Sequence, residues 1–158
     1  RGTADAIYQN INFIDNYDPD HIIVLSGDQI CTMDYAKMLQ YHKEKDADCT
    51  ISVLNVTYEE AKRFGIMNTD EDERIYEFEE KPEHPKSNKA AFATYMYTKE
   101  TVPMIKKYLE TGNMPDAPGY FLQWLHKKKP VYAYVMNGEC YDVGTLKALE
   151  EVRSIYGN

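Results

Sequence analysis

The chain has 158 residues, of which 43% are hydrophobic and 28% are charged, a balance typical of one soluble domain with a buried core. Its formal net charge of −8 argues against nucleic-acid binding through bulk positive charge, and no apolar run approaches the ~20 residues that a membrane span needs. Cys31, Cys49 and Cys140 lie far apart without a C-x-x-C pair, and we expect reduced, buried cysteines in a cytoplasmic protein.

The first third of the chain predicts two helices that alternate with two strands. The predicted elements are a helix that starts at Thr3 and ends before Pro19, a strand at 21–25, a helix capped by Asp34, and a strand at 49–56. This spacing is typical of a parallel βαβ unit, in which ligands bind beyond the carboxyl ends of the strands. Ser26, Gly27 and Asp28 follow the first strand, so they stand where such a ligand would bind.

The remaining sequence continues the same α/β pattern without a linker or an internal repeat. We expect a short helix at 58–63, a hairpin of strands at 66–68 and 75–78, a loop at 81–89, a strand at 90–97, a helix at 101–109 closed by Gly112, a helix at 118–126, a strand at 131–135, and a strand end or turn at 141–144. Thr145 should cap a final helix with Leu146, Leu149, Val152 and Tyr156 facing inward. The chain is therefore predicted to be one α/β unit.

Two aspartates stand at predicted strand ends and could act together. In "SGDQ", Gly27 would let the backbone approach a ligand, and Asp28 offers the hard oxygen that Mg²⁺ prefers. In "YDVGT", Asp142 comes just before the helix capped by Thr145. Two such carboxylates can share Mg²⁺, and nucleotidyl transfer needs this clamp because charge builds on the phosphate oxygens. Each aspartate taken alone could instead end a strand or cap a turn.

Three further motifs offer groups that could contact a phosphorylated sugar or a nucleotide. In "EEKP", Lys81 precedes a proline and should be extended, with its ammonium aimed at an anion, while Glu80 could accept hydrogen bonds from sugar hydroxyls. In "RFGIM", Gly65 could let a ligand approach the backbone. In "RGTADA", Gly2 and Thr3 open a helix with free N–H groups. The alternatives are a charged strand end, a turn glycine and simple helix capping.

The order of these motifs is more specific than any one of them. The series G-T-A-D-A, L-S-G-D, F-G, E-K-P and D-V-G-T resembles the sugar-1-phosphate nucleotidyltransferases, and most closely the bacterial glucose-1-phosphate adenylyltransferases, over essentially the whole chain. The resemblance implies a Rossmann-like mixed sheet with flanking helices that lacks the family's N-terminal strands. Residues 1–158 would then be the C-terminal portion of a catalytic domain, which makes ADP-glucose and pyrophosphate from ATP and glucose 1-phosphate for glycogen biosynthesis.

The same resemblance implies a role for each motif residue. Asp28, Lys81 and Asp142 would be catalytic. Asp28 and Asp142 would hold Mg²⁺, and Lys81 would bind the phosphate of glucose 1-phosphate. Glu80 would bind the glucose hydroxyls. The residues expected to contact substrates are Gly2, Thr3, Gly27, Gly65, Glu80 and Lys81.

The chain departs from the family pattern at several points. The glycine-rich signature that grips the triphosphate lies before G-T-A-D-A in the family and is absent here, so we expect this chain alone to be inefficient. Gln29 stands where the adenylyltransferases usually have His, and Ala91 stands where they have a sugar-contacting Ser. These differences leave open dTDP-, UDP- or GDP-sugar synthesis, or a non-catalytic sugar-phosphate-binding or regulatory module.

A missing first strand would also leave the strand at 22–25 without a neighbour on one side. Exposed strand edges and apolar helix faces favour self-association. We therefore expect a homo-oligomer.

Overall fold

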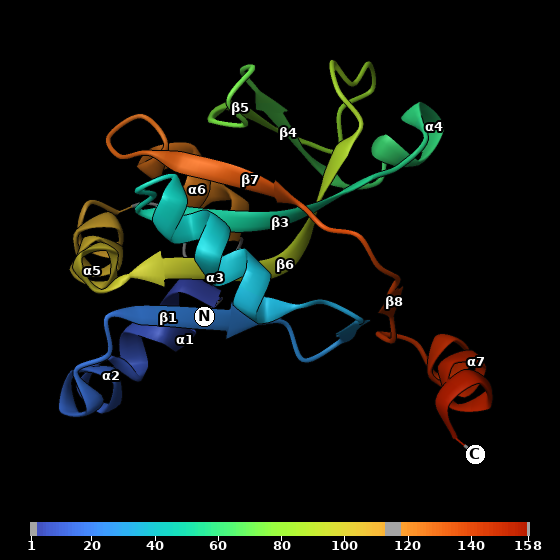
Figure 1. Cartoon of the computed structure of the whole chain (residues 1–158), viewed down its shortest axis with the longest axis horizontal. Coiled ribbons are helices and arrows are strands. Elements are labelled where there is room, and N and C mark those ends of the chain that lie inside the picture. The colour runs from blue at the N-terminus through green and yellow to red at the C-terminus, as the bar shows by residue number, and fades with distance from the viewer. Residues whose placement is uncertain (1–2, 113–117, 158) are drawn as a thin grey trace.

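A mixed sheet organises the part of the chain that the computed structural model describes, residues 3–112 and 118–157 (Figure 1). Its strands are β1 (His21–Leu25), β3 (Cys49–Asn55), β4 (Gly65–Thr69), β5 (Ile75–Glu80), β6 (Lys89–Thr98) and β7 (Val131–Val135). The order is β5-β4-β6-β3-β7, and β1 pairs with the second half of β6. The strands pair antiparallel except for β3 and β7, which are parallel, so the predicted mixed α/β sheet is confirmed.

The two strands of the predicted βαβ unit, β1 and β3, run in the same direction as expected, but they are not neighbours in the sheet. Both β1 and β3 run antiparallel to the 10-residue strand β6, which lies between them. Tyr95 of β6 is thus opposite Val24 on one side and Ile51 on the other. Because β1, β3 and β7 all point the same way, their C-terminal ends lie at one edge of the sheet, which we call the carboxyl edge (Figure 1).

Helices lie on both faces of this sheet. They are α1 (Thr3–Gln9), α2 (Ile11–Tyr17), α3 (Tyr35–Glu44), α4 (Tyr58–Ala61), the 3₁₀ helix η1 (Lys99–Thr101), α5 (Val102–Glu110), α6 (Pro118–Leu125) and α7 (Leu146–Tyr156). The single first helix that the sequence predicts is split at Asn10, whose backbone leaves the helical region. Across residues 3–112 and 118–157, none of the helices has the length and apolar character needed to cross a bilayer.

The main core lies between the sheet and helices α1, α5 and α6. On β3 the odd-numbered residues Cys49, Ile51 and Val53 face this core, as the period-two geometry of a strand requires. The residue between the first two, Thr50, faces the other side and contacts His42 of α3, with 2.6 Å between Thr50 Oγ1 and His42 Nδ1. The predicted N-cap of α3 is confirmed, because the Asp34 carboxylate accepts hydrogen bonds from the first turn of the helix.

Two short strands form a separate ribbon at the carboxyl edge. Strand β2 (Gln29–Cys31) pairs antiparallel with β8 (Cys140–Asp142), and α7 follows β8 (Figure 1). Because α7 projects beyond the ribbon rather than covering the sheet, the predicted inward face is only partly correct. Val152 is buried, but Leu146 and Tyr156 are 81% and 51% exposed.

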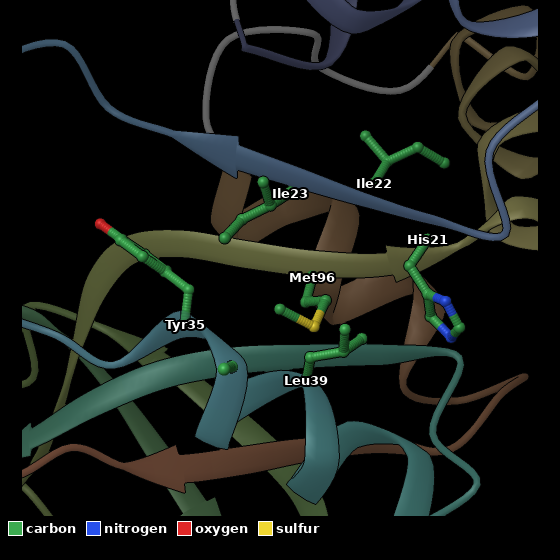
Figure 2. A pocket seen from close by; sticks show the side chains of 7 residues that line it. His21, Ile22, Ile23, Tyr35, Leu39 and Met96 are labelled. Atoms are coloured by element: carbon green, nitrogen blue, oxygen red, sulfur yellow. The ribbon is translucent and has the colours of Figure 1, made fainter. Parts of the chain in front are cut away.

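Strand β1 borders an apolar groove of about 280 Å³. Figure 2 shows that Ile23, Tyr35, Leu39 and Met96 gather between β1, β6 and α3. Within the described residues β1 pairs only with β6, so its other edge is unpaired, as the sequence predicts.

Candidate active site

The ribbon brings Asp28 and Asp142 together from positions more than a hundred residues apart. Gln29 lies opposite Asp142 in the pairing of β2 and β8. The pairing extends by one more residue, because the Val143 N–H donates a 2.7 Å hydrogen bond to the Asp28 carbonyl oxygen. The two aspartates therefore stand at the same end of the ribbon, just after the carboxyl end of β1.

Gly144 lies against both carboxylates. A Cβ atom built on Gly144 would be 3.0 Å from Asp142 Oδ1 and 3.9 Å from Asp28 Oδ2, so the two side chains lie around one small space. The Gly144 N–H donates to Asp142 Oδ1 at 2.9 Å, and the Ser26 hydroxyl donates to Asp28 Oδ1. These two hydrogen bonds fix one oxygen of each carboxylate and leave the other oxygens toward solvent, since both aspartates are exposed.

The two carboxylates fit Mg²⁺ better than a metal that needs a closed protein cage. In the described residues no group of three or more His, Cys, Asp or Glu side chains forms a metal cluster. Mg²⁺ is commonly held by one or two carboxylates and completes its octahedron with water and substrate phosphates. An exposed pair of aspartates is such a donor set, and Asp28 and Asp142 are the residues that would hold the ion.

A pocket of about 190 Å³ contains two of the predicted sugar-contacting residues. Gly65 begins β4, Glu80 ends β5, and the two residues are opposite each other in the hairpin. The full lining is Gly65, Met67, Phe78, Glu80, Ala91, Tyr95, Gly119 and Leu122. The hairpin predicted from the sequence thus places Gly65 and Glu80 side by side in one cavity.

Glycines on two elements make room for the Phe78 ring beside this pocket. A Cβ atom on Gly65 would be 2.8 Å from the Phe78 ring, and one on Gly119 of α6 would be 2.5 Å from it. The same Cβ atom on Gly65 would be 3.4 Å from Glu80 Oε2. Side chains at either glycine would therefore push the ring, and at Gly65 would also occupy space beside the carboxylate.

Tyr95 and Gly119 are pocket residues that sequence reasoning missed. Burial, and next the neighbouring Cys49 and Glu80, raise the pKa of the Tyr95 hydroxyl above its usual value of 10.0. The hydroxyl therefore stays neutral at physiological pH. Because β6 lies in the middle of the sheet, its aromatic residues indicate a buried strand, and nothing in the sequence distinguishes Tyr95 from Tyr97.

Lys81 does not have the extended backbone that was predicted from the following proline. Its φ is +45°, in the left-handed region, and its N–H donates a 3.1 Å hydrogen bond to the Phe64 carbonyl oxygen. The chain leaves β5 at this residue, and this turn overrides the usual preference before proline. Lys81 is exposed and directly follows Glu80, but its side chain is not part of the pocket lining.

The structure gives less information about the other three predicted contact residues, Gly2, Thr3 and Gly27. Gly2 lies outside the described residues, and Thr3 is the first residue of α1, with a side chain that is likewise outside them. Gly27 lies in the turn between β1 and β2, and a Cβ atom there would meet no atom of the described residues within 4 Å. Space beside Gly27 is thus open, whereas space beside Gly65 is filled by Phe78.

The pocket and the ribbon share the carboxyl edge. Val53, near the end of β3, pairs with Ala91 of the pocket on one side and with Val135, the last residue of β7, on the other. Strand β7 then leads to β8, and Cys140 packs against a cluster of buried residues that includes Ile66 and Ala90. Both parts of the candidate site therefore stand where ligands bind in sheets of this kind.

The prediction of three reduced, buried cysteines is wrong for two of them. Cys49 is free and buried, but Cys31 and Cys140 are opposite each other in the ribbon and form a disulfide. The sequence does hold a signal for this disulfide, because each cysteine lies close to one of the two aspartates. Cys31 lies three residues after Asp28, and Cys140 lies two residues before Asp142. The signal is informative only once an antiparallel pairing of these two segments is assumed.

Comparison with protein families matches the whole chain. The model of the nucleotidyl transferase family covers residues 1–158. Two similar curated proteins are glucose-1-phosphate adenylyltransferases from Clostridium novyi (strain NT), 53% identical over 154 residues, and from Geobacillus stearothermophilus, 49% identical over 156 residues. These matches cover 94% and 95% of this chain but only 40% of each relative, so the chain spans less than half the length of the relatives.

A solved structure supports the fold. A glucose-1-phosphate thymidylyltransferase from Bacillus anthracis, crystallised with sucrose, matches with a TM-score of 0.77 over 98% of this chain and 60% of its own. Its sequence is 24% identical, so the likeness concerns the arrangement of strands and helices rather than the substrate.

Proposed function

The chain belongs to the nucleotidyl transferase family, and on that premise we propose that the complete protein transfers a nucleotidyl group from ATP to glucose 1-phosphate. The products would be ADP-glucose and pyrophosphate. The observation that carries the proposal is the position of Asp28 and Asp142 at one end of the ribbon, because nucleotidyl transfer needs carboxylates that can hold a metal ion against phosphates. The choice of ATP and glucose rests on the relatives named glucose-1-phosphate adenylyltransferase.

In this proposal the ribbon positions the reacting phosphates. Asp28 and Asp142 would hold Mg²⁺, and Ser26 and Gly144 orient the two carboxylates by donating one hydrogen bond to each. Magnesium, when bound, supplies positive charge to the phosphate oxygens, on which negative charge builds during transfer. Gly27 leaves open space beside the metal carboxylates, through which the phosphates can reach them.

The pocket of β4, β5 and β6 holds the sugar. Glu80 accepts hydrogen bonds from the glucose hydroxyls, and the sugar lies beside the Phe78 ring, for which the absence of a side chain at Gly65 makes room. The neutral Tyr95 hydroxyl offers one more polar group inside the same cavity. Lys81, next to Glu80 and exposed, binds the phosphate of glucose 1-phosphate through its ammonium group.

The reaction is a direct displacement at phosphorus. A phosphate oxygen of glucose 1-phosphate attacks the α-phosphorus of ATP. The bond from that phosphorus to the bridging oxygen breaks, and pyrophosphate leaves with the bonding electrons. Gly2 and Thr3 would lie near the adenine, as the family motif implies. The protein contributes orientation and charge, and no covalent enzyme intermediate is required.

A second candidate is another nucleotidyltransferase that makes a dTDP-, UDP- or GDP-sugar. It is favoured by Ala91, a pocket residue at a position where the resemblance leads us to expect a sugar-contacting Ser. The third candidate is a non-catalytic sugar-phosphate-binding module, which would bind its ligand in the pocket and make no use of the ribbon.

We further propose that the protein is cytoplasmic and that its ADP-glucose serves glycogen synthesis.

Substrate panels distinguish these candidates. The complete protein is incubated with Mg²⁺, glucose 1-phosphate and either ATP, dTTP, UTP or GTP, and pyrophosphate release is measured together with the mass of the sugar nucleotide. We expect ADP-glucose to form fastest. Faster synthesis from another nucleotide would support the second candidate. Binding of glucose 1-phosphate by calorimetry without any product would support the third.

A further inference from the structure

The ribbon that positions Asp28 and Asp142 has little secondary structure of its own. Each of its strands is three residues long, and an isolated pair of strands is marginally stable at best. Its two segments are also far apart along the chain, so the entropy lost on pairing them is that of a long loop. Backbone hydrogen bonds at its two ends, from Thr32 to Glu139 at 2.9 Å and from Val143 to Asp28 at 2.7 Å, hold the strands together.

One covalent bond joins the two strands between these ends. Cys31 and Cys140 are a register pair with 4.1 Å between their Cα atoms, and they form a disulfide across 109 residues of sequence. Because side chains alternate along a strand, Cys140 lies on the same face of the ribbon as Asp142, two residues away. The disulfide therefore lies two register positions from the Gln29–Asp142 pair, with Ile30 and Tyr141 between them, and it is the nearest pair on the same face.

The two sulfurs differ from the third cysteine in their surroundings. Cys31 and Cys140 are half-buried at the carboxyl edge, where a small dithiol can reach them. Cys140 Sγ also lies 3.8 Å from Met136 Sδ, just before the ribbon begins. Cys49, by contrast, is fully buried in the main core, and burial raises the pKa of its thiol, which keeps it protonated and unreactive.

We propose that Cys31 and Cys140 are a reversible dithiol–disulfide pair whose oxidised form holds the two aspartate-bearing strands together. Disulfides in cytosolic proteins are usually transient or redox-sensing, because cellular dithiols reduce them. The location in the cytoplasm and the metal-binding role of the aspartates rest on the proposed function. The pairing of the two cysteines does not.

The exchange balances with a dithiol as the reductant. A thiolate of the dithiol attacks one sulfur of the Cys31–Cys140 bond, which breaks and releases the other cysteine as a thiolate that takes up a proton. The second thiol of the reductant then attacks the mixed disulfide and releases the second cysteine. Two electrons and two protons pass to the protein, and the reductant becomes a cyclic disulfide.

Reduction should loosen the ribbon and leave the sheet intact. The complete protein is compared with and without dithiothreitol by differential thiol alkylation with peptide mass spectrometry and by amide hydrogen exchange. We expect that, of the cysteines at 31, 49 and 140, Cys49 alone is free before reduction and all three are free after it, with a loss of protection at 29–32 and 140–143 while β3 and β6 stay protected. Free thiols at both Cys31 and Cys140 after incubation with glutathione disulfide, or unchanged protection of the ribbon on reduction, would overturn the proposal.

Two variants separate the pair from the rest of the molecule. The double variant Cys31→Ser with Cys140→Ser should show the loose ribbon with or without dithiothreitol. Cys49→Ala, in which only the core cysteine is changed, should keep the response of the wild type. Sensitivity of the double variant to dithiothreitol would place the effect elsewhere and contradict the proposal. The wild-type comparison needs no substitution, so a folding defect in either variant does not remove the test.

Metal binding gives a second measurement, with Mn²⁺ alone as the probe. We expect the dissociation constant for Mn²⁺ to rise about tenfold on reduction, the lower end of what loss of supporting groups costs a metal site. Equal affinities in the two states would show that the pair does not act on the aspartates and would overturn that part of the proposal. If neither state binds Mn²⁺ while the ribbon still loosens on reduction, the proposed metal site fails and the redox pair stands.

Discussion

The pocket beside Glu80 and the ribbon that carries Asp28 and Asp142 stand at the same edge of the sheet, but they are held in opposite ways. The pocket is cut into the packed body of the molecule, where Met67 and Leu122 are almost completely buried. The ribbon projects from that body, and its aspartates are exposed. Changes in the ribbon should therefore alter function with little effect on folding, whereas changes in the body should alter stability first.

The strongest test of this contrast is Asp142→Asn in the complete protein. Removal of one of the two proposed metal-binding carboxylates should lower kcat by about 10²–10³-fold, comparable to the loss of one preorganised electrostatic group, with little change in thermal stability. Stability should hold because the Asn side-chain oxygen can still accept the Gly144 N–H hydrogen bond that Asp142 Oδ1 accepts. Pyrophosphate release and a thermal melt measure the two effects.

A matched control for this substitution is Asp46→Asn. Asp46 is exposed, lies at the end of α3 and has a φ of +48°, a conformation that Asn tolerates well. It should leave both activity and melting temperature unchanged. Full activity of Asp142→Asn would show that the ribbon does not hold the metal.

The body of the molecule should respond to pH through His42. Burial, and next the charges of His21 and Lys43, lower the pKa of this imidazole from 6.5 to about 4. Among the described residues its Nε2 atom has no hydrogen-bond partner, so a proton there would be buried and unpaired. Between pH 6.5 and 4 the unfolded chain binds a proton that the folded chain does not, so stability should fall as pH falls, by up to about 3 kcal/mol.

Chemical unfolding between pH 7.5 and 5.5 measures the first part of this fall, above most of the range in which carboxylates titrate. His42→Asn keeps a polar atom near Thr50 Oγ1, where His42 Nδ1 lies at 2.6 Å, and it should flatten the pH dependence of the unfolding free energy. An unchanged slope in this variant would assign the pH dependence to other groups. Protection of the ribbon amides should not depend on His42 in either case.

The pocket belongs to the packed body, and Gly65→Ala tests it. The added methyl would press on the Phe78 ring and stand 3.4 Å from Glu80 Oε2, so the ring must shift within the pocket. We expect the KM for glucose 1-phosphate to rise about tenfold, equal to about 1.4 kcal/mol, with a smaller change in kcat. Gly27→Ala is the structural comparison, because a Cβ atom there meets nothing and should leave the melting temperature unchanged.

Most of the sheet could be predicted from sequence because its signals are local. The hairpin that joins Gly65 to Glu80 surrounds a charged turn, and the caps at Asp34 and Thr145 depend on residues two or three positions away. The motif order also predicts the family correctly, and the family model matches the whole chain.

The ribbon could not be predicted in this way because its pairing joins distant segments. Three-residue strands such as β2 show no periodicity, and the partner of Cys31 lies 109 residues away. The left-handed backbone of Lys81 was missed for a related reason. The residue before a proline usually prefers an extended backbone, but at Lys81 a hydrogen bond to the Phe64 carbonyl oxygen outweighs this preference. That hydrogen bond exists only in the folded hairpin.

The smallest expected effect concerns the edge of β1 that pairs with no strand of the described residues. Ile23 and Leu25 are 40% and 51% exposed beside the apolar groove, so we expect the 158-residue chain to self-associate there. Ile23→Lys should shift the species measured by analytical ultracentrifugation toward the monomer mass of 18.4 kDa, since a charge at a strand edge opposes pairing. Phe13→Lys, at a 63% exposed position on α2, should not cause this shift. A wild-type chain that sediments only as a monomer would contradict the expectation and would make the groove a surface that stays open without a partner.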